Sequence, residues 1–120
     1  MGGVSMSCIF CKIINGEIPS NKVYEDDKVL AFNDINPVAP FHVLVIPKKH
    51  YESILDIDDN DMEIIAHIHK VINKLVKEKG YDKTGFRIIN NCGSDGCQEV
   101  KHIHYHVLAG KKLDWYDACK

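Results

Sequence analysis

One long amphipathic segment, residues 58–80, limits the folds that this chain of 120 residues can adopt. Asp58, Asp59 or Asn60 can cap its start, and Gly80 can end it. Its apolar side chains recur every three or four residues: Met62, Ile65, Ile68 or His69, Ile72, Leu75 and Val76. The pattern predicts a helix of about 30 Å, which is as long as a small domain is wide.

Short segments rich in β-branched and aromatic residues stand before and after this helix. The expected strands are residues 22–24, 29–32, 42–46, 86–90 and 102–109. The charged stretch 25–28 suits a hairpin turn between the first two. A short helix is expected over residues 8–15, with Gly16 as its stop. This order of elements predicts an α+β domain in which one short and one long helix cover an antiparallel sheet.

Composition allows one domain and argues against several classes of partner. A hydrophobic content of 45% in 120 residues can fill one compact core. Asp and Glu number 17 against 15 Lys and Arg, a balance that disfavours general nucleic-acid or membrane-surface binding. No apolar run approaches the roughly 18 residues that span a bilayer, and the start lacks a signal-peptide pattern. We expect a cytoplasmic protein, with the nucleus as the alternative location.

The segment HIHYHVL, residues 102–108, carries three of the seven histidines. In a strand, alternate side chains share a face, so His102, His104 and His106 are expected on one face, about 6.7 Å apart. A lone histidine would most simply belong to a polar strand face, but three in phase indicate a site. A largely neutral imidazole can attack phosphorus, transfer a proton or bind a metal, and the spacing leaves these chemistries open.

Two further motifs accompany the histidines. The loop NCGSDGCQ, residues 91–98, can turn backbone N–H groups toward an anion, although GSDG is equally common in ordinary turns and no P-loop lysine follows it. Cys8 and Cys11 form a CxxC pair, which in a reducing compartment indicates metal or redox chemistry. A redox motif needs a βαβ context that is absent here, whereas two distant histidines would complete a Cys2His2 zinc set.

HIHYHVL matches a pattern of histidines alternating with apolar residues, and other stretches match in order: CIFCKIINGEIP, FNDINPVAPFHVLVIPKKH and NNCGSDGCQEVKHIHYHVLAGKKLDW. With these stretches the chain resembles the nucleotide-binding branch of the histidine-triad family. The resemblance implies an N-terminal extension over residues 1–7, a histidine-triad domain over 8–115 and a tail over 116–120. It also implies a two-fold homodimer, in which Trp115 could approach the partner's site and shape the choice of leaving group.

The resemblance further implies a purine nucleoside phosphoramidase that cleaves the P–N bond of adenosine 5′-phosphoramidates such as AMP-NH2 and AMP-lysine. His104 would attack the α-phosphorus and form a nucleotidyl-histidine intermediate, which water would hydrolyse. His106 would contact the phosphate, and His42 would help to hold the triad. Three alternatives remain: a dinucleoside polyphosphate hydrolase, a nucleotide-binding regulatory or scaffold protein, and a bare metal-binding module.

A nucleotide-binding set follows from the same resemblance. Asn91 and Gln98 would donate to the phosphate, beside Cys97 in the same loop, and Asp34 would accept from the ribose hydroxyls. The base would lie against apolar walls, which favour purines but distinguish adenine from guanine poorly. These walls, which would equally suit a core, are Phe10, Ile13, Ile18, Ile35 and Leu44.

Residues 97–99, Cys-Gln-Glu, depart from the Gly-Gln-Ser stretch of the family's commonest phosphoramidases. Glu99 occupies the position of a serine that can supply a proton to the leaving amine. An ionised carboxylate there would repel the phosphate. Glu99 therefore either turns away or has a raised pKa and acts as the acid.

The resemblance implies one metal and no organic cofactor. Some histidine-triad proteins with this CxxC motif, and related nucleotidyltransferases, bind zinc through the pair, the PKKH histidine and the first triad histidine. In this chain those residues are Cys8, Cys11, His50 and His102. Such a zinc would be structural and would tie the N-terminal helix to the catalytic strand, leaving His104 and His106 for catalysis.

Overall fold

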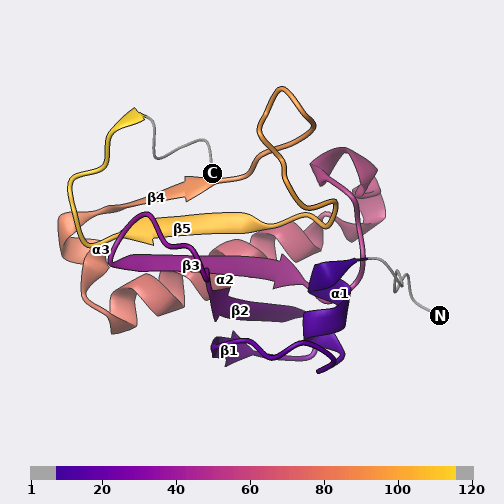
Figure 1. Cartoon of the computed structure of the whole chain (residues 1–120), viewed down its shortest axis with the longest axis horizontal. Coiled ribbons are helices and arrows are strands. Elements are labelled where there is room, and N and C mark those ends of the chain that lie inside the picture. Colours follow the sequence, from indigo (N-terminus) through magenta and orange to yellow (C-terminus); the bar gives the residue numbers. More distant parts are fainter. Residues whose placement is uncertain (1–7, 116–120) are drawn as a thin grey trace.

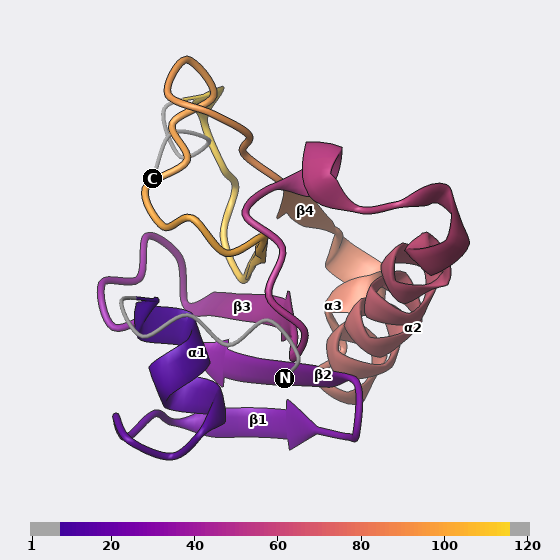
Figure 2. The same ribbon diagram turned by 90° about the vertical axis from the view of Figure 1, so that its right-hand side faces the viewer.

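The predicted α+β architecture is present in the computed structural model, which describes residues 8–115; the predicted extension and tail lie outside them. Helices α1 (Ile9–Ile14) and α2 (Glu63–Glu78) lie on opposite faces of one sheet, and the short α3 (Tyr81–Thr84) follows α2 (Figures 1 and 2). All neighbouring strands are antiparallel, in the order β1-β2-β3-β5-β4. The strands are β1 (Lys22–Glu25), β2 (Val29–Asn33), β3 (Phe41–Pro47), β4 (Phe86–Ile89) and β5 (Tyr105–Ala109).

The central strands bury both of their faces, because each face of the sheet has its own helix. Val43 of β3 and Val107 of β5 belong to the apolar cluster under α2. Leu44 belongs to the cluster under α1. Since side chains alternate along a strand, His42 and His106 share the α1 face with Leu44. The fold thereby brings strand histidines next to the CxxC helix.

Helix α2 packs its apolar stripe on the sheet as predicted, but it begins later than expected. The predicted caps, Asp58 to Asn60, instead belong to a separate 3-10 helix at Asp59–Asp61, and no side chain caps α2. The Asp61 carboxylate accepts hydrogen bonds from Tyr51 Oη (2.7 Å) and Lys49 Nζ (3.1 Å). The Asp61 side chain is therefore hydrogen-bonded to Tyr51 and Lys49 and does not cap α2. The buried residues of α2 are Ile68, Val71, Ile72, Leu75 and Val76.

The last strand also begins later than predicted, at Tyr105 rather than at His102. On the opposing strand, pairing ends at Val45, and beyond it Pro47 has no N–H to donate. The Pro47 carbonyl contacts the His102 ring, and the N–H of Ile103 donates to Tyr51 O at 2.7 Å. His102 therefore leaves the row of histidines that a continuous strand would make. Within the described residues, no helix is long and apolar enough to cross a membrane.

One carboxylate ties the turn between β1 and β2 to α2. Asp26 Oδ1 accepts the N–H groups of Lys28 (2.8 Å) and Val29 (2.9 Å). Its Oδ2 accepts from Tyr24 Oη (2.8 Å) and lies 2.7 Å from His67 Nε2. Burial alone would raise the pKa of this carboxyl, but the four hydrogen bonds outweigh it and hold the pKa well below its ordinary value.

Replacing this carboxylate, in Asp26→Asn, is expected to lower the free energy of unfolding at pH 7 by about 1–2 kcal/mol. The folded-state pKa of Asp26 is depressed, so its contribution is present above the unfolded pKa of about 3.9 and is lost as pH falls below it. Urea denaturation at pH 7 and pH 3 measures the difference. Asp27→Asn, at the exposed neighbouring position, is the control; equal losses in both variants would contradict the assignment.

Candidate functional site

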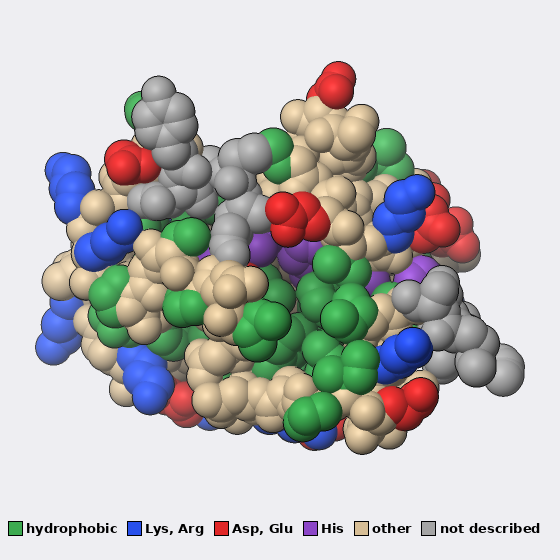
Figure 3. Space-filling model, in the orientation of Figure 1, with side chains coloured by type: hydrophobic (Ala, Val, Ile, Leu, Met, Phe, Trp, Pro, Cys, Tyr) green, Lys and Arg blue, Asp and Glu red, His purple; other side chains and the backbone are tan. Residues whose placement is uncertain are grey.

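Two clusters of histidines lie on the α1 face of the sheet. In Figure 3, histidine side chains form the floor of a hollow between an apolar surface and the loop that precedes β5. One cluster consists of Cys8, Cys11, His50 and His102; the second contains Asp34, His42 and His106. In each, the candidate ligand atoms lie within 4.8 Å of one another. Spacing alone would admit a metal in either, so their hydrogen bonds must distinguish them.

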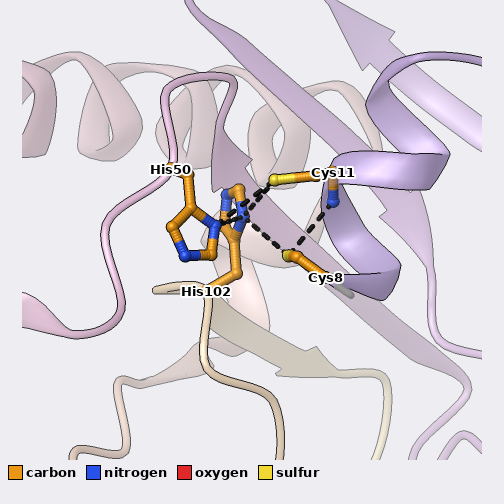
Figure 4. Close-up of side chains that lie close together, drawn as sticks. All are labelled: Cys8, Cys11, His50 and His102. Carbon is orange, nitrogen blue, oxygen red and sulfur yellow. Dashed lines mark hydrogen bonds between the residues drawn. The ribbon is translucent and has the colours of Figure 1, made fainter. Parts of the chain in front are cut away.

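The first cluster, hereafter the cage, joins three separate segments of the chain (Figure 4). Sγ of Cys8 lies 3.3 Å from Nδ1 of His102, and Sγ of Cys11 lies 3.3 Å from Nδ1 of His50. The two Nδ1 atoms are 3.1 Å apart. Tetrahedral zinc, with bonds of about 2.3 Å to sulfur and 2.0 Å to nitrogen, sets such separations at about 3.5 and 3.3 Å. The cage therefore has the size of that coordination sphere.

The protonation of the cage also suits a metal. Nε2 of His102 lies 2.8 Å from the Pro47 carbonyl, which can only accept, so Nε2 carries the hydrogen and Nδ1 offers a lone pair. Burial lowers the pKa of His102 to about 4, which keeps its ring neutral at pH 7. Burial raises the pKa of the Cys8 thiol and favours its protonated form without a cation, so a metal would have to displace that proton; the Cys11 N–H, which the sulfur accepts at 3.2 Å, favours the thiolate. Thiolate and neutral imidazole are the ligands of a structural zinc site.

In the second cluster, a hydrogen and not a lone pair points toward the other members. The N–H of Val38 donates to Nδ1 of His42 at 3.1 Å, so in the neutral ring Nε2 carries the hydrogen. That Nε2 lies 3.0 Å from Nδ1 of His106 and 3.3 Å from Oδ2 of Asp34. A metal at this place would need a lone pair where His42 has a hydrogen. The cluster fits a hydrogen-bonded relay, hereafter the relay, better than a metal site.

His104 lies between the cage and the relay. Its Nδ1 donates to the carbonyl of His102 at 2.8 Å, which leaves Nε2 with the lone pair. Asn90 Nδ2 holds the carbonyl of His104 itself at 3.0 Å, and the Phe10 ring packs edge-on at 5.2 Å between centroids. Burial lowers the pKa of His104, so a neutral ring with a nucleophilic Nε2 prevails at pH 7. The ring of His106 stands 5.0 Å away.

The predicted base-pocket residues do not all lie together. Phe10, Ile13 and Leu44 are buried in one cluster, with Ile18 packed against it. Ile35 is 91% exposed and stands apart from them. It follows Asp34 directly in the chain, so an apolar side chain projects into solvent beside the carboxylate of the relay. A planar ligand bound there would cover it.

The loop before the triad is held by its own hydrogen bonds. Both hydrogens of the Gln98 amide are engaged, by the carbonyls of Glu52 (2.6 Å) and Val100 (3.0 Å), and its Oε1 accepts the N–H of Gly93. Gln98 thus fixes the loop, and both of its amide hydrogens are engaged within the chain. In contrast, Asn91 Nδ2 is buried and has no hydrogen-bond partner among the described residues.

Two positions explain how the loop closes on itself. A Cβ at Gly96 would stand 2.4 Å from the carbonyl oxygen of Cys92, so only glycine fits there. Cys97 adopts a φ of 65°, the left-handed region that glycine occupies at least cost. At position 97 the resemblance expects a glycine, and this chain has a cysteine in the backbone conformation that suits glycine. Glu99, the other departure, is exposed and lines a cavity of about 360 Å³ with Glu52.

Three groups that orient the histidines of the site could not be predicted from the sequence. The N–H of Val38 sets the His42 ring, the carbonyl of Pro47 sets that of His102, and Asn90 holds His104. Two of these are backbone groups, which every residue has. The role of Asn90 was not predicted, because two asparagines stand side by side and the resemblance assigns a role only to Asn91.

Residues 7–115 match the family model described as scavenger mRNA decapping enzyme C-term binding. A solved histidine triad protein from Clostridium difficile is 74% identical and superposes with a TM-score of 0.89, over 92% of this chain and 96% of that one. The chain belongs to the histidine-triad family. The expected histidine-triad fold is thereby confirmed.

Two further relatives have names that describe function. A solved HIT family hydrolase from Legionella pneumophila is 48% identical, with a TM-score of 0.88 over 91% of this chain and 97% of that one. The 14 kDa zinc-binding protein of Zea mays is 45% identical over 89% of this chain and 84% of its own length. Hydrolase and zinc-binding proteins therefore stand among the relatives of this histidine-triad chain.

Proposed function

We propose that this histidine-triad protein is a purine nucleoside phosphoramidase that releases AMP from adenosine 5′-phosphoramidates. One observation carries the proposal: His104 is buried with its Nδ1 hydrogen fixed on the His102 carbonyl, so a neutral Nε2 lone pair is held in place. Nδ1 of the adjacent His106 lies 3.0 Å from Nε2 of His42, and when it accepts the His42 hydrogen its own Nε2 becomes a donor. A nucleophilic imidazole beside a donating imidazole suits attack on phosphorus.

The reaction has two steps. Nε2 of His104 forms a bond to the α-phosphorus while the P–N bond breaks, and the departing nitrogen keeps the electron pair and takes up a proton from solvent water, which regains one when water attacks phosphorus in the second step. The Nδ1–H bond to the His102 carbonyl stabilises the positive charge that develops on the ring. His106 Nε2–H donates to a phosphate oxygen. Water then attacks phosphorus, the bond to His104 breaks, and AMP leaves.

Nucleotide recognition is assigned to residues around the relay. Asp34 accepts from the ribose hydroxyls, because a carboxylate can accept two hydrogen bonds from a diol. Asn91, whose buried Nδ2 has no partner among residues 8–115, donates to the phosphate. Ile35 covers one side of the base, which would bury an apolar side chain that is otherwise 91% exposed.

We assign a zinc ion to the cage. Its ligand separations and its neutral His102 fit Zn²⁺, and the four protein ligands make the ion structural. When bound, it ties α1 to the segments that carry His50 and His102. His104 lies two residues after His102, so the ion holds the approach to the nucleophile in place without entering the reaction.

We also propose a homodimer. β4 is an edge strand of the sheet, and its Phe86 is 36% exposed. Edge strands require cover, which a second copy can supply. Trp115 is 87% exposed and lies beside Arg87, whose guanidinium carbon is 6.0 Å from the ring. In the dimer this aromatic side chain is free to approach the partner's site.

The test is AMP release from adenosine 5′-phosphoramidate and from its lysine conjugate by zinc-loaded protein, followed by chromatography. We expect turnover of both substrates and slower turnover of diadenosine polyphosphates. AMP binding without turnover by well-folded protein would contradict the enzyme and favour a nucleotide-binding regulator. Faster cleavage of diadenosine polyphosphates would favour a hydrolase of that class.

Glu99 is exposed, so we propose that its side chain turns away from the phosphate. Glu99→Gln is then expected to lower KM two- to threefold, because removal of one solvent-screened negative charge relieves about 0.5 kcal/mol of repulsion on the substrate phosphate. The effect should vanish at 1 M salt, where screening is strong. Glu63→Gln, on α2, is the matched control. A large fall in kcat with an altered pH profile would instead make Glu99 the acid.

A further inference from the structure

The relay contains one hydrogen with two competing acceptors. The Val38 N–H on Nδ1 fixes the hydrogen of neutral His42 on Nε2. This hydrogen can be directed to Nδ1 of His106 at 3.0 Å or to Oδ2 of Asp34 at 3.3 Å. A hydrogen shared between two acceptors makes a weaker bond to each than one that points at a single acceptor. The strength of the His42–His106 hydrogen bond therefore depends on whether Asp34 also accepts the His42 hydrogen.

Asp34 is placed to receive a ligand as well as to compete. The N–H of Asn36 donates to its Oδ1 at 2.8 Å, which fixes the carboxylate plane while Oδ2 faces His42. Its side chain keeps 13% of its surface exposed, whereas that of His42 has none. A diol approaching from solvent thus meets Asp34 first. Each carboxylate oxygen has lone pairs for a further donor.

We propose that the ribose hydroxyls, by donating to Asp34, release the His42 hydrogen to His106 and so set His106 as an Nε2–H donor for the phosphate. The inference rests on the proposed function and deepens it. Asp34 is then a positioning residue that acts through His42, and the sugar contributes to the chemical step as well as to binding. No bond to phosphorus changes in this event; one hydrogen bond is exchanged for another.

The kinetic test compares adenosine 5′-phosphoramidate with its 2′,3′-dideoxy analogue in single-turnover reactions at saturating, zinc-loaded protein. We expect the maximal rate of wild type to fall about tenfold or more for the dideoxy substrate, since one hydrogen-bond donor to the developing charge contributes about 10²–10³-fold. In Asp34→Ala the competing acceptor is gone, so the two substrates should react at similar rates. The dideoxy substrate should react faster with Asp34→Ala than with wild type. Asp82→Asn, on exposed α3, is the control.

A second measurement does not depend on turnover or on folding of a variant. In ¹⁵N-histidine-labelled wild type, saturating AMP should shift His106 toward the Nε2–H tautomer, and saturating 2′,3′-dideoxy-AMP should not. Equal tautomers with both ligands, or a dideoxy effect confined to KM, would overturn the inference while leaving the phosphoramidase intact. Absence of phosphoramidate cleavage by wild type would instead contradict the proposed function.

Discussion

His104→Ala is expected to lower the rate of AMP release from adenosine 5′-phosphoramidate by at least about 10⁴-fold. The variant removes an imidazole whose Nε2 lone pair is fixed by the His102 carbonyl and whose ring burial keeps neutral, and which, unlike His102, is not a member of the cage. Water cannot replace this nucleophile, because it would lack the positioning that the His102 carbonyl supplies. Release of AMP, measured with excess substrate and in single turnover, checks the prediction.

The loss must be separated from damage to the fold. His104 packs against the Phe10 ring, so its truncation leaves space beside α1 and is expected to lower the unfolding temperature by a few degrees. Zinc content and AMP affinity should stay within about twofold of wild type. His69→Ala removes an exposed histidine of α2 and serves as the matched control. Turnover that survives in His104→Ala would place the nucleophile elsewhere.

The sequence predicted those parts of the fold that local pattern determines. The strands 22–25, 29–33, 41–47 and 86–89 lie within one residue of the segments rich in β-branched and aromatic side chains, and the buried face of α2 follows helical spacing. The starts of α2 and β5 could not be predicted, because tertiary contacts decide them. Asp61 is engaged by Tyr51 and Lys49, and the carbonyl opposite His102 is engaged by its ring.

For the site, too, the residues could be predicted, but the hydrogen bonds that orient them could not. Resemblance selected the four cage residues, and the structure places their ligand atoms together. It did not reveal how the two buried rings are oriented: His42 directs its Nε2 hydrogen into the relay, whereas His102 directs its Nε2 hydrogen to a carbonyl and leaves Nδ1 for the cage. That difference depends on the Val38 N–H and the Pro47 carbonyl, which lie near the rings only in the folded chain. Gln98 and Ile35 show what resemblance leaves out: both match the family pattern, but only the folded chain shows that the Gln98 amide donates to two carbonyls and that Ile35 is exposed.

Removal of the cage is expected to have the largest effect on stability. Protein purified without chelator should hold one zinc per chain, and Cys11→Ser should lose most of it. Structural zinc contributes about 10–16 kcal/mol in small zinc peptides; with an independent apolar core here, we expect a smaller loss of several kcal/mol. Metal analysis and thermal unfolding, with and without EDTA, measure both quantities.

Cobalt substitution tests the ligand set directly. Co²⁺ bound by Cys8 and Cys11 should give a thiolate charge-transfer band, which Cys11→Ser weakens and which Cys92→Ser, a half-buried thiol outside the cage, leaves unchanged. The band and the stability should fall together at acid pH, because protons compete with the metal for thiolate and imidazole. If Cys11→Ser unfolded with the same free energy as Cys92→Ser, the cage would be a cluster of buried side chains and not a zinc site. The geometry argues otherwise, because the Nδ1 atoms of His50 and His102 lie 3.1 Å apart and the Cys11 sulfur lies 3.3 and 3.6 Å from them, which brings these ligand atoms as close together as a shared cation requires.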